Sequence, residues 1–272
     1  MAAAPSSQDV FRKYEILLAS VAARPGWVAF SGGVDSSLLL KAVAEAGPSA
    51  AVALFADSPL QSRFDRENVK QLSEFLGVQL QVVEVAPLLL PEFALNPGNR
   101  CYFCKKSIYR QFQLLLPPGR ALLDGTNRDD LETCRPGQQA MDELGVVSPL
   151  VEADLRKAEV RELARRFGLP NWSRPSSSCL ATRIPEGFPV TPELLRYIEE
   201  RESLIRARGF GHIRLRLNDG GREDVTVELA REEMDLPDFS GHREAISQAF
   251  RQIGVVRIRF VGREGVFVSD PG

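Results

Sequence analysis

Residues 27–40 read Trp27-Val-Ala-Phe-Ser-Gly-Gly-Val-Asp-Ser-Ser-Leu-Leu-Leu40, and this stretch decides the fold. The apolar residues 27–30 predict a short strand, the Ser-Gly-Gly that follows predicts a tight turn, and residues 34–46 predict an Ala- and Leu-rich helix. Gly32 and Gly33 carry no side chain that would keep an anion away from the backbone. The first N–H groups of a helix lack intrahelical partners and carry partial positive charge, so the turn predicts a phosphate-binding loop. The alternative is a turn that merely starts a helix.

The hydroxyls of Ser31, Ser36 and Ser37 add donors to this loop. No lysine follows the glycines in the Walker A arrangement, so the loop is not a P-loop of that kind. Instead, Ser-Gly-Gly-Val-Asp-Ser at 31–36 resembles the PP-loop signature of the N-type ATP pyrophosphatases. The resemblance implies that ATP is cleaved between its α- and β-phosphates and that AMP is left on a substrate oxygen. The nucleotide contacts expected in this loop are Ser31, Gly32, Gly33, Asp35 and Ser36.

Bulk composition excludes several classes of protein. The chain has 272 residues, a hydrophobic content of 44% and a net charge of −2, so no global basic field exists to hold a long nucleic acid. No apolar stretch is long enough to predict a transmembrane helix, and residues 1–7 do not resemble a secretory signal. Four cysteines are too few for a disulfide scaffold. We therefore expect a cytoplasmic protein with reduced thiols.

Strand and helix patterns alternate in the first part of the chain, which predicts an α/β fold with a Rossmann-like, mostly parallel sheet. The pattern gives a PP-loop ATP pyrophosphatase domain at 1–170, an active-site loop at 171–190 and a smaller α/β domain at 191–272, for substrate binding or oligomerisation. The predicted strands are 27–31, 51–56, 78–85, 120–124 and 146–148, then 213–217, 225–229 and 256–260. The predicted helices are 8–24, 35–46, 61–76, 101–115, 155–167 and 240–253, with a further helix starting after Thr191 as N-cap.

Ligands bind at the carboxyl ends of strands in such sheets, so the turns after three predicted strands are expected to converge on one site. These turns are the SGGVDS loop, residues 56–60 and residues 124–127. Asp35 would help to hold Mg²⁺ against the phosphates, or would cap the helix, or both. The further candidates from these turns are Ser58, Gly125, Thr126 and Asn127 for the nucleotide, Asp130 for Mg²⁺, and Arg135 for a phosphate or a substrate carboxylate. A plain surface loop at 124–130 is the alternative.

The cysteines give a separate signal. Cys101 and Cys104 form a C-x-x-C that opens a predicted helix, and Cys179 lies in the long loop. A C-x-x-C is found in redox pairs, zinc sites and iron–sulfur sites, and also by chance. A closed zinc site needs four ligands, and no second C-x-x-C is present. Three cysteines on a [4Fe–4S] cluster would leave one iron open. No role follows for Cys134.

Arg214 and Arg216 lie two residues apart on a predicted strand, so they face the same side and can clamp a phosphate. Glu202 and Glu228 would pair with them or bind a metal. The alternative for all four is a solvated strand face.

Taken together, SGGVDSSLL at 31–39, Ser-Pro-Leu at 58–60, DGTNRDDL at 124–131 with RPG at 135–137, and SRPSSSCLATRIPEG at 173–187 resemble the LarE family. LarE proteins are ATP-dependent sulfur transferases in the synthesis of the nickel-pincer nucleotide, the cofactor of lactate racemase. The resemblance implies that carboxylates of pyridinium-3,5-biscarboxylic acid mononucleotide are adenylated and converted to thiocarboxylates.

The resemblance also implies two possible sulfur sources. In one branch of the family the sulfur of the residue at Cys179 is sacrificed, which leaves dehydroalanine. In another branch three cysteines hold a [4Fe–4S] cluster, and Cys101, Cys104 and Cys179 resemble that branch. Arg183, Arg214 and Arg216 suit a small anionic nucleotide substrate, and the family suggests a homo-oligomer. A tRNA thiolase is the main alternative; a PP-loop ligase with structural zinc and a non-catalytic nucleotide sensor are the others.

Overall fold

The computed structural model describes residues 7–47, 51–132 and 136–263. The chain forms two compact units. The first unit comprises Met1–Ser58, Arg63–Pro87 and Asn99–Ser176, and the second comprises Pro59–Ser62, Leu88–Gly98 and Ser177–Gly272. Two short segments within the predicted first domain therefore belong to the second unit.

The first unit is built on a four-stranded sheet in the order β3-β2-β1-β4, with every neighbouring pair parallel. The strands are β1 (Gly26–Ala29), β2 (Val52–Asp57), β3 (Gln79–Glu84) and β4 (Ala121–Leu123). Val147 adds an isolated parallel bridge to Leu123, at the place where a short strand was predicted. The α/β class and the parallel sheet are thus confirmed.

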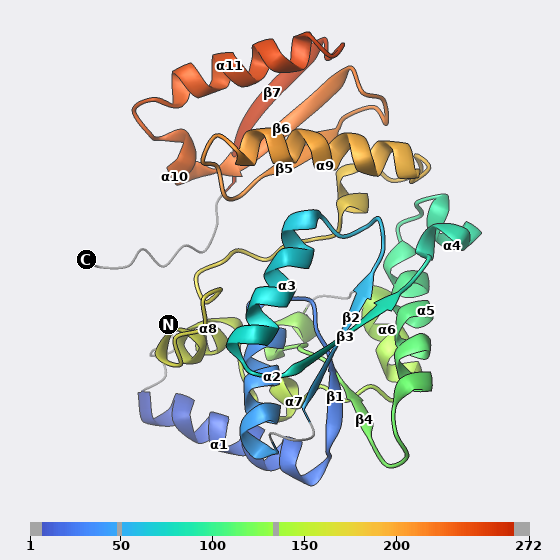
Figure 1. Cartoon of the computed structure of the whole chain (residues 1–272), viewed down its shortest axis with the longest axis vertical. Coiled ribbons are helices and arrows are strands. Elements are labelled where there is room, and N and C mark those ends of the chain that lie inside the picture. The colour runs from blue at the N-terminus through green and yellow to red at the C-terminus, as the bar shows by residue number, and fades with distance from the viewer. Residues whose placement is uncertain (1–6, 48–50, 133–135, 264–272) are drawn as a thin grey trace. The chain divides into compact units, whose positions relative to one another are not determined.

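Helices cover both faces of this sheet (Figure 1). Alternate residues of a strand point to opposite faces. In β2, Ala53 and Phe55 accordingly join a core cluster shared with α1, α2 and α8, whereas Val52 and Leu54 join a cluster with α5 and α6. The helices of this unit are α1 (Ser7–Ala23), α2 (Val34–Ala46), α3 (Arg63–Phe75), α5 (Arg100–Leu115), α6 (Pro136–Glu143), α7 (Pro149–Glu152) and α8 (Lys157–Arg166), with the 3₁₀ turn η3 at Arg128–Glu132.

The long predicted helices and strands match these bounds within a few residues, but the short helices were missed. Helices α6 and α7 each begin with a proline, at Pro136 and Pro149, which is a favourable first helical residue because its missing N–H has no partner there in any case. Segments of eight and four residues are too short for a helical apolar period to stand out.

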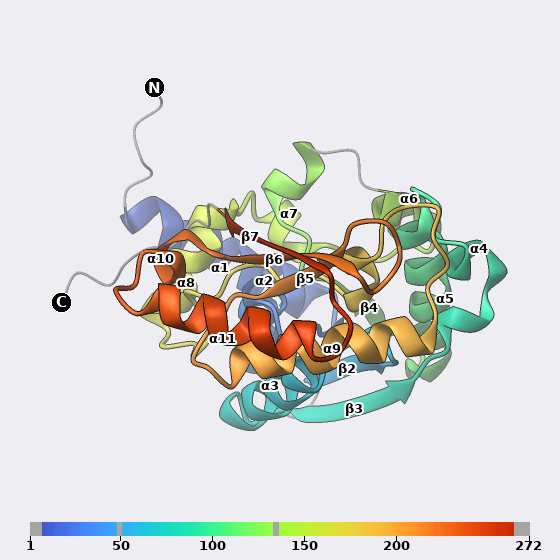
Figure 2. The ribbon, with the colours of Figure 1, turned by 90° about the horizontal axis from the view of Figure 1, so that it is seen from above.

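The second unit holds a three-stranded sheet in the order β5-β6-β7. Strand β5 (Arg214–Leu217) is antiparallel to β6 (Asp224–Ala230), which is parallel to β7 (Arg257–Arg263). Helices α9 (Pro192–Arg206) and α11 (Phe239–Arg251) lie on the same side of this sheet (Figure 2). Shorter elements of the unit are α4 (Pro91–Ala94), α10 (Arg231–Met234) and the 3₁₀ turns η2 (Pro87–Leu89, which begins in the first unit) and η4 (Leu180–Arg183).

Alternation along β5 and β6 separates an apolar face from a charged one. Leu215, Leu217 and Val227 are buried, while Arg214 and Arg216 lie on the other face of the same sheet. Helix α9 begins as predicted, because the hydroxyl of Thr191 accepts a hydrogen bond from the N–H of Leu194 at 3.3 Å.

Candidate functional site

The turn after β1 takes the shape expected of an anion-binding loop. Gly32 has φ +73°, in the left-handed region that glycine adopts without strain. A Cβ at this position would lie 2.6 Å from the Nδ2 atom of Asn68 and 2.9 Å from a methyl of Val69. The carbonyl oxygen of Gly32 accepts hydrogen bonds from Nδ2 of Asn68 at 3.1 Å and of Asn171 at 2.9 Å. Both amides thus fix the loop through its backbone.

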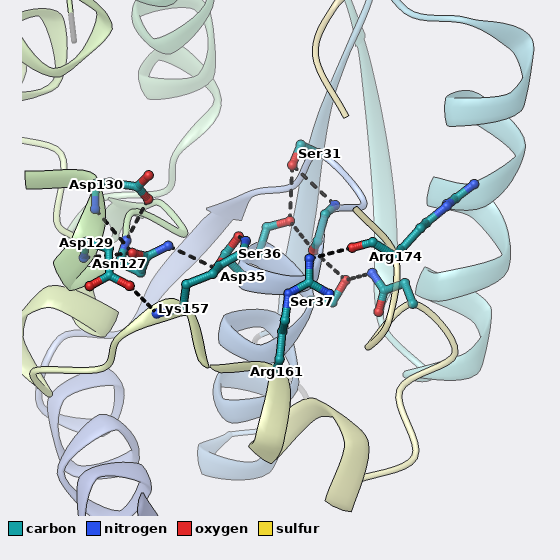
Figure 3. A network of polar contacts seen from close by, with 12 residues as sticks. Ser31, Asp35, Ser36, Ser37, Asn127, Asp129, Asp130, Lys157, Arg161 and Arg174 are labelled. Carbon is teal, nitrogen blue, oxygen red and sulfur yellow. Dashed lines mark hydrogen bonds and ion pairs between the residues drawn. The ribbon is translucent and has the colours of Figure 1, made fainter. Parts of the chain in front are cut away.

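The loop serines order the first turn of α2. The hydroxyls of Ser36 and Ser37 donate to the carbonyl of Gly33 at 3.1 and 2.9 Å, and the Oγ atoms of Ser31 and Ser36 lie 3.3 Å apart (Figure 3). Gly33, the residue before the helix, has an extended conformation and no capping side chain. The first N–H groups of α2 are therefore not capped from that position, as a phosphate-binding helix start requires.

The turn after β4 packs directly against this helix start. A Cβ on Gly125 would lie 2.7 Å from the backbone nitrogen and 2.9 Å from the Cα of Ser36. The preceding Asp124 is buried and accepts hydrogen bonds from the N–H and hydroxyl of Thr126 at 3.1 and 3.0 Å and from Ser148 at 2.9 Å. The sequence-predicted Gly125 and Thr126 thus lie at the phosphate loop, with the Thr126 hydroxyl engaged by Asp124.

The carboxylate of Asp35 lies between two partners from distant parts of the chain (Figure 3). Its Oδ1 atom accepts from Nδ2 of Asn127 at 3.1 Å, and its Oδ2 atom forms an ion pair with the ammonium of Lys157. The side chain of Asp35 is 19% exposed and that of Lys157 is 28% exposed. Two of the three turns that were predicted to converge, the first and the third, therefore meet at Asp35, and the sequence did not indicate the contact with Lys157.

Asn127 also organises its own turn. Its backbone N–H donates to Asp130 at 3.1 Å, and its side-chain oxygen accepts from the N–H of Asp129 at 2.9 Å. Asp129 in turn accepts from the N–H of Lys157 at 2.8 Å, at the first residue of α8. A carboxylate at that position is favoured by the helix dipole and fixes the helix start.

A buried arginine on α8 holds the segment that follows it. The two terminal nitrogens of Arg161 donate to the carbonyl oxygens of Trp172 and Arg174, both at 2.7 Å (Figure 3). Burial lowers the pKa of Arg161, and the negative charge of Asp35 acts in the opposite direction. Together with Asn171, this arginine fastens the start of the predicted active-site loop beside the phosphate loop.

The turn after β2 contributes Ser58, which is buried. Its carbonyl oxygen accepts from Arg66 of α3 at 2.6 Å, and Arg66 also donates to Asp57 at 2.5 Å. This arginine fixes the end of β2 at the carboxyl edge of the sheet, where the nucleotide was predicted to bind.

In the second unit, the predicted substrate contact Arg183 is buried. It is 5% exposed and forms an ion pair with Glu202, which is 4% exposed, at 2.8 Å. Its remaining donors reach the hydroxyl and carbonyl of Ser178 at 2.8 and 2.9 Å and the hydroxyl of Thr182 at 2.9 Å. Glu202 also accepts from the N–H of Leu215 at 2.9 Å. These contacts tie η4 to α9 and β5.

The two arginines predicted on β5, Arg214 and Arg216, have different electrostatic surroundings. Arg216 forms an ion pair with Glu228 and donates to the carbonyl of Thr182 at 3.0 Å. The pKa of Arg214 is lowered to about 10, chiefly by burial, with the like charges of Arg263 and Arg183 adding to the effect. An anion beside Arg214 would offset these like charges.

The cysteines predicted to act together come from both units. Cys101 and Cys104 lie one turn apart on α5, so they share one side of that helix, with Cys101 exposed and Cys104 half-buried. Cys179 precedes η4 in the second unit, and all three are reduced thiols. Among the residues that the structure describes, no group of three or more His, Cys, Asp or Glu side chains is placed to hold a metal ion. The cluster therefore stays a prediction. Cys134 and the predicted substrate contact Arg135 lie outside the described residues.

Four residues that hold the glycine loop or the segments beside it were not predicted from the sequence: Asn68, Lys157, Arg161 and Asn171. Each lies on a helix or in a turn that is distant in sequence from residues 31–37. A single polar residue in a helical pattern gives no sign of such a contact, because it is expected to face solvent. Asn171 could have been noticed, because this polar residue is the first of the predicted active-site loop.

Three similar proteins bear on this site. An uncharacterised protein of Synechocystis sp. is 37% identical over 191 residues, 70% of this chain and 71% of that protein. The pyridinium-3,5-bisthiocarboxylic acid mononucleotide synthase of Lactiplantibacillus plantarum is 31% identical over 230 residues, 84% of this chain and 82% of that protein. The tRNA(Ile)-lysidine synthase of Pseudomonas putida is 30% identical over 238 residues, 78% of this chain and 52% of that protein. No protein-family model matches the chain.

The chain has a parallel sheet with a glycine loop after its first strand, and it is similar to these synthases. These features together define a protein of the PP-loop ATP pyrophosphatase class. Within that class, the chain belongs to the LarE family, since its match to the synthase of L. plantarum covers most of both proteins. In the described part of the chain, no helix has the length and apolar character needed to cross a membrane.

Proposed function

We propose that this chain is an ATP-dependent sulfur transferase that acts on the carboxylates of pyridinium-3,5-biscarboxylic acid mononucleotide. The observation that carries the proposal is the likeness to the L. plantarum synthase, which extends over 84% of the chain and so reaches beyond the nucleotide-binding unit. The geometry of the glycine loop supports the ATP half of the reaction, and the arginines of β5 support binding of a small anionic substrate.

In the first step a substrate carboxylate oxygen attacks the α-phosphorus of ATP. The bond to the bridging oxygen of the β-phosphate breaks, pyrophosphate leaves, and an acyl adenylate forms. The N–H groups at the start of α2, with the hydroxyls of Ser31 and Ser36, would hold the pyrophosphate. Asp35 would hold Mg²⁺, whose preferred ligands are carboxylate and phosphate oxygens, and Asp130 is the second candidate ligand. Ser58, Gly125, Thr126 and Asn127 would complete the nucleotide site.

In the second step a sulfur nucleophile attacks the acyl carbon and AMP leaves. If Cys179 supplies the sulfur, its thiolate forms a thioester, a base removes the Cα proton, and the Cβ–Sγ bond breaks. The products are then a thiocarboxylate and dehydroalanine at position 179. Arg183 contacts Ser178 and Thr182 on both sides of Cys179, so it would hold this segment in place beside the anionic substrate that it was predicted to bind.

A [4Fe–4S] cluster on Cys101, Cys104 and Cys179 is the source of sulfur that we favour, and the sacrificial Cys179 is the alternative. The spacing of two cysteines on one turn of α5 supports it. Such a cluster, when bound, would offer an open iron to carry an additional sulfide.

The first experiment is anaerobic turnover of the purified chain with ATP, Mg²⁺ and the biscarboxylic acid mononucleotide. We expect AMP, pyrophosphate and a thiocarboxylate product by mass spectrometry. Iron and sulfide assays of the anaerobic protein, and the mass of the peptide that contains Cys179, then separate the two sources. About four irons per chain, lost in Cys101→Ala, indicates the cluster; a peptide lighter by H₂S indicates the sacrificial route. Absence of AMP formation with this substrate would reject the proposal.

A second candidate, tRNA thiolation, is favoured by the likeness to a tRNA(Ile)-lysidine synthase. The net charge of −2 argues against it, because polynucleotide binding relies on basic surfaces. Sulfur incorporation into tRNA, but not into the mononucleotide, under the same anaerobic conditions would establish this candidate instead.

We also propose that the chain forms a homo-oligomer. The resemblance to the LarE family carries this proposal. Light scattering coupled to size exclusion gives the mass in solution, and a monomer at micromolar concentration would contradict this.

A further inference from the structure

Lys157 lies where a metal ion is expected. Its ammonium forms an ion pair with the Oδ2 atom of Asp35, while Oδ1 of the same carboxylate accepts from Asn127. Both oxygens of Asp35 are thus engaged. A Mg²⁺ ion that binds Asp35 would lie beside the ammonium of Lys157, and the repulsion between the two cations favours departure of the ammonium.

Of the two partners of Asp35, Lys157 can move away more easily than Asn127. Asn127 is buried and is fixed by Asp129 and Asp130 at several points of its turn. The side chain of Lys157 is 28% exposed, and its ammonium donates to Asp35. The backbone of Lys157 is held by Asp129, so only the flexible four-carbon stem would move.

The ammonium also stands at the start of α2, where phosphates are expected. An ammonium has three donors and no fixed fork, so it can exchange a carboxylate for a phosphate oxygen without any backbone change. Removal of a cation from Asp35 is compensated when Mg²⁺ arrives at the same carboxylate.

We propose that Lys157 is the resident counter-ion of Asp35 in the nucleotide-free protein and that it moves to a phosphate of ATP when Mg²⁺ takes over Asp35. The inference rests on the proposed function for its ATP, and it adds a positioning residue that exchanges partners. Lys157 thereby opposes binding of the metal alone. By neutralising Asp35, it also lowers the repulsion that a nucleotide without metal would meet.

The two opposite effects define the experiment. Mn²⁺ binding without nucleotide is measured by electron paramagnetic resonance, and binding of α,β-methylene-ATP, which cannot be cleaved at the bond in question, is measured by calorimetry without metal. In Lys157→Met we expect Mn²⁺ alone to bind about fivefold more tightly, and the metal-free nucleotide to bind about tenfold more weakly.

Three variants control the measurement. Lys41→Met removes an ammonium of similar exposure that pairs with Glu45 on the same helix α2, and should change neither affinity. Lys157→Arg keeps the positive charge and should keep Mn²⁺ binding weak. Lys157→Met/Asp35→Asn should lose the gained Mn²⁺ affinity, and thermal unfolding verifies that each variant is folded.

Weaker or unchanged Mn²⁺ binding in Lys157→Met would overturn the proposal, as would a gained affinity that persists in the double variant. Nucleotide binding that does not change on loss of the ammonium would overturn it as well. If the unaltered protein binds no nucleotide even with Mg²⁺, the failure instead lies with the proposed ATP-dependent function, since Mn²⁺ binding by Asp35 is measured separately.

Discussion

At the scale of single residues, Gly32 is where the backbone geometry of the phosphate loop is most demanding. Its left-handed conformation and the 2.6 Å approach of Asn68 leave no room for a side chain. We expect Gly32→Ala to lower the free energy of unfolding by about 2 kcal/mol. Nucleotide binding should be lost as well, because the carbonyl of Gly32 would lose its bonds to Asn68 and Asn171.

Gly33 is the matched control for that prediction. It has φ −75°, and a Cβ there would meet nothing closer than the Oγ of Ser31 at 3.4 Å. Gly33→Ala should therefore cost less than about 1 kcal/mol. Urea unfolding and calorimetric titration with ATP check both variants, and equal losses in the two would contradict the distinction.

The buried ion pair of Arg183 and Glu202 gives a second residue-scale prediction. Arg183→Met leaves a carboxylate buried without its cation, which should destabilise the protein by about 3–5 kcal/mol. Arg183→Met/Glu202→Leu should recover much of that loss. Arg251→Met, which breaks an exposed pair with Glu244, should change stability by no more than about 1 kcal/mol. Urea unfolding of the full chain measures all three, and a harmless Arg183→Met would refute the account.

Residue roles were the least predictable part of the sequence. Asp35 was correctly placed at the loop, but its partner Lys157 lies 122 residues further on, and no local pattern links the two. Arg183 was predicted, with Arg214 and Arg216, to suit a small anionic substrate, and the sequence did not indicate its burial or its pairing with Glu202. Its apolar neighbours Leu180, Ala181 and Ile184 are all buried, and that burial carries the arginine inward.

At the scale of elements, α8 connects the phosphate loop to the segment that leads to Cys179. Arg161→Met would leave the carbonyls of Trp172 and Arg174 without their donors, at a cost of about 2 kcal/mol. We expect faster amide hydrogen exchange in residues 171–176 and weaker ATP binding. Arg165→Met, on the same helix but exposed and paired with Glu162, should leave exchange in that segment unchanged. Unaltered exchange in Arg161→Met would show that other contacts hold the segment.

Helix α5 is joined to the turn after β4 through Tyr109, which donates to Asp124 at 3.3 Å. The pKa of Tyr109 lies well above 10, chiefly because burial disfavours the charged phenolate, with Asp124 adding to the effect. The folded state therefore keeps a proton that the unfolded state loses above about pH 10. Stability from this group is complete below that pH and is lost as the pH rises further.

Tyr109→Phe should accordingly flatten the decline of unfolding free energy above pH 10. Some decline should remain, because burial and the neighbouring Glu45 also raise the pKa of Tyr14. Chemical unfolding at a series of alkaline pH values measures the two slopes, and identical slopes in variant and parent would refute the assignment.

Long elements with a clear apolar period were predicted closely, as α2 and α9 show, and so was the parallel order implied by alternating strands and helices. What the patterns missed was which segments assemble together. Residues 59–62 and 88–98 join the second unit although they interrupt the first in the sequence. Membership of a unit is decided by long-range packing such as the bond from Leu180 to Leu60 at 2.9 Å, which periodicity does not contain.

At the scale of the whole molecule, a net charge of −2 limits the partners that the chain can hold. We expect tRNA to bind no more tightly than about 10⁻⁶ M at physiological salt, with an affinity that falls steeply as salt is raised. Filter binding between 50 and 200 mM salt, a range chosen to expose that dependence, provides the check. Tight, salt-insensitive tRNA binding would contradict the small-molecule assignment.

The close approach of Gly125 to Ser36 has a consequence for how the protein is made. The phosphate loop emerges from the ribosome early. Its later contacts are made by Gly125, Lys157 and Asn171, which lie 89 to 139 residues further along the chain than the loop residues that they contact. A growing chain that ends before β4 therefore has the glycine loop without the turn that packs against it. On the proposed function, ATP binding requires that residues 121–171 have been synthesised and docked. Nucleotide would then stabilise finished first units and leave shorter nascent chains unassisted.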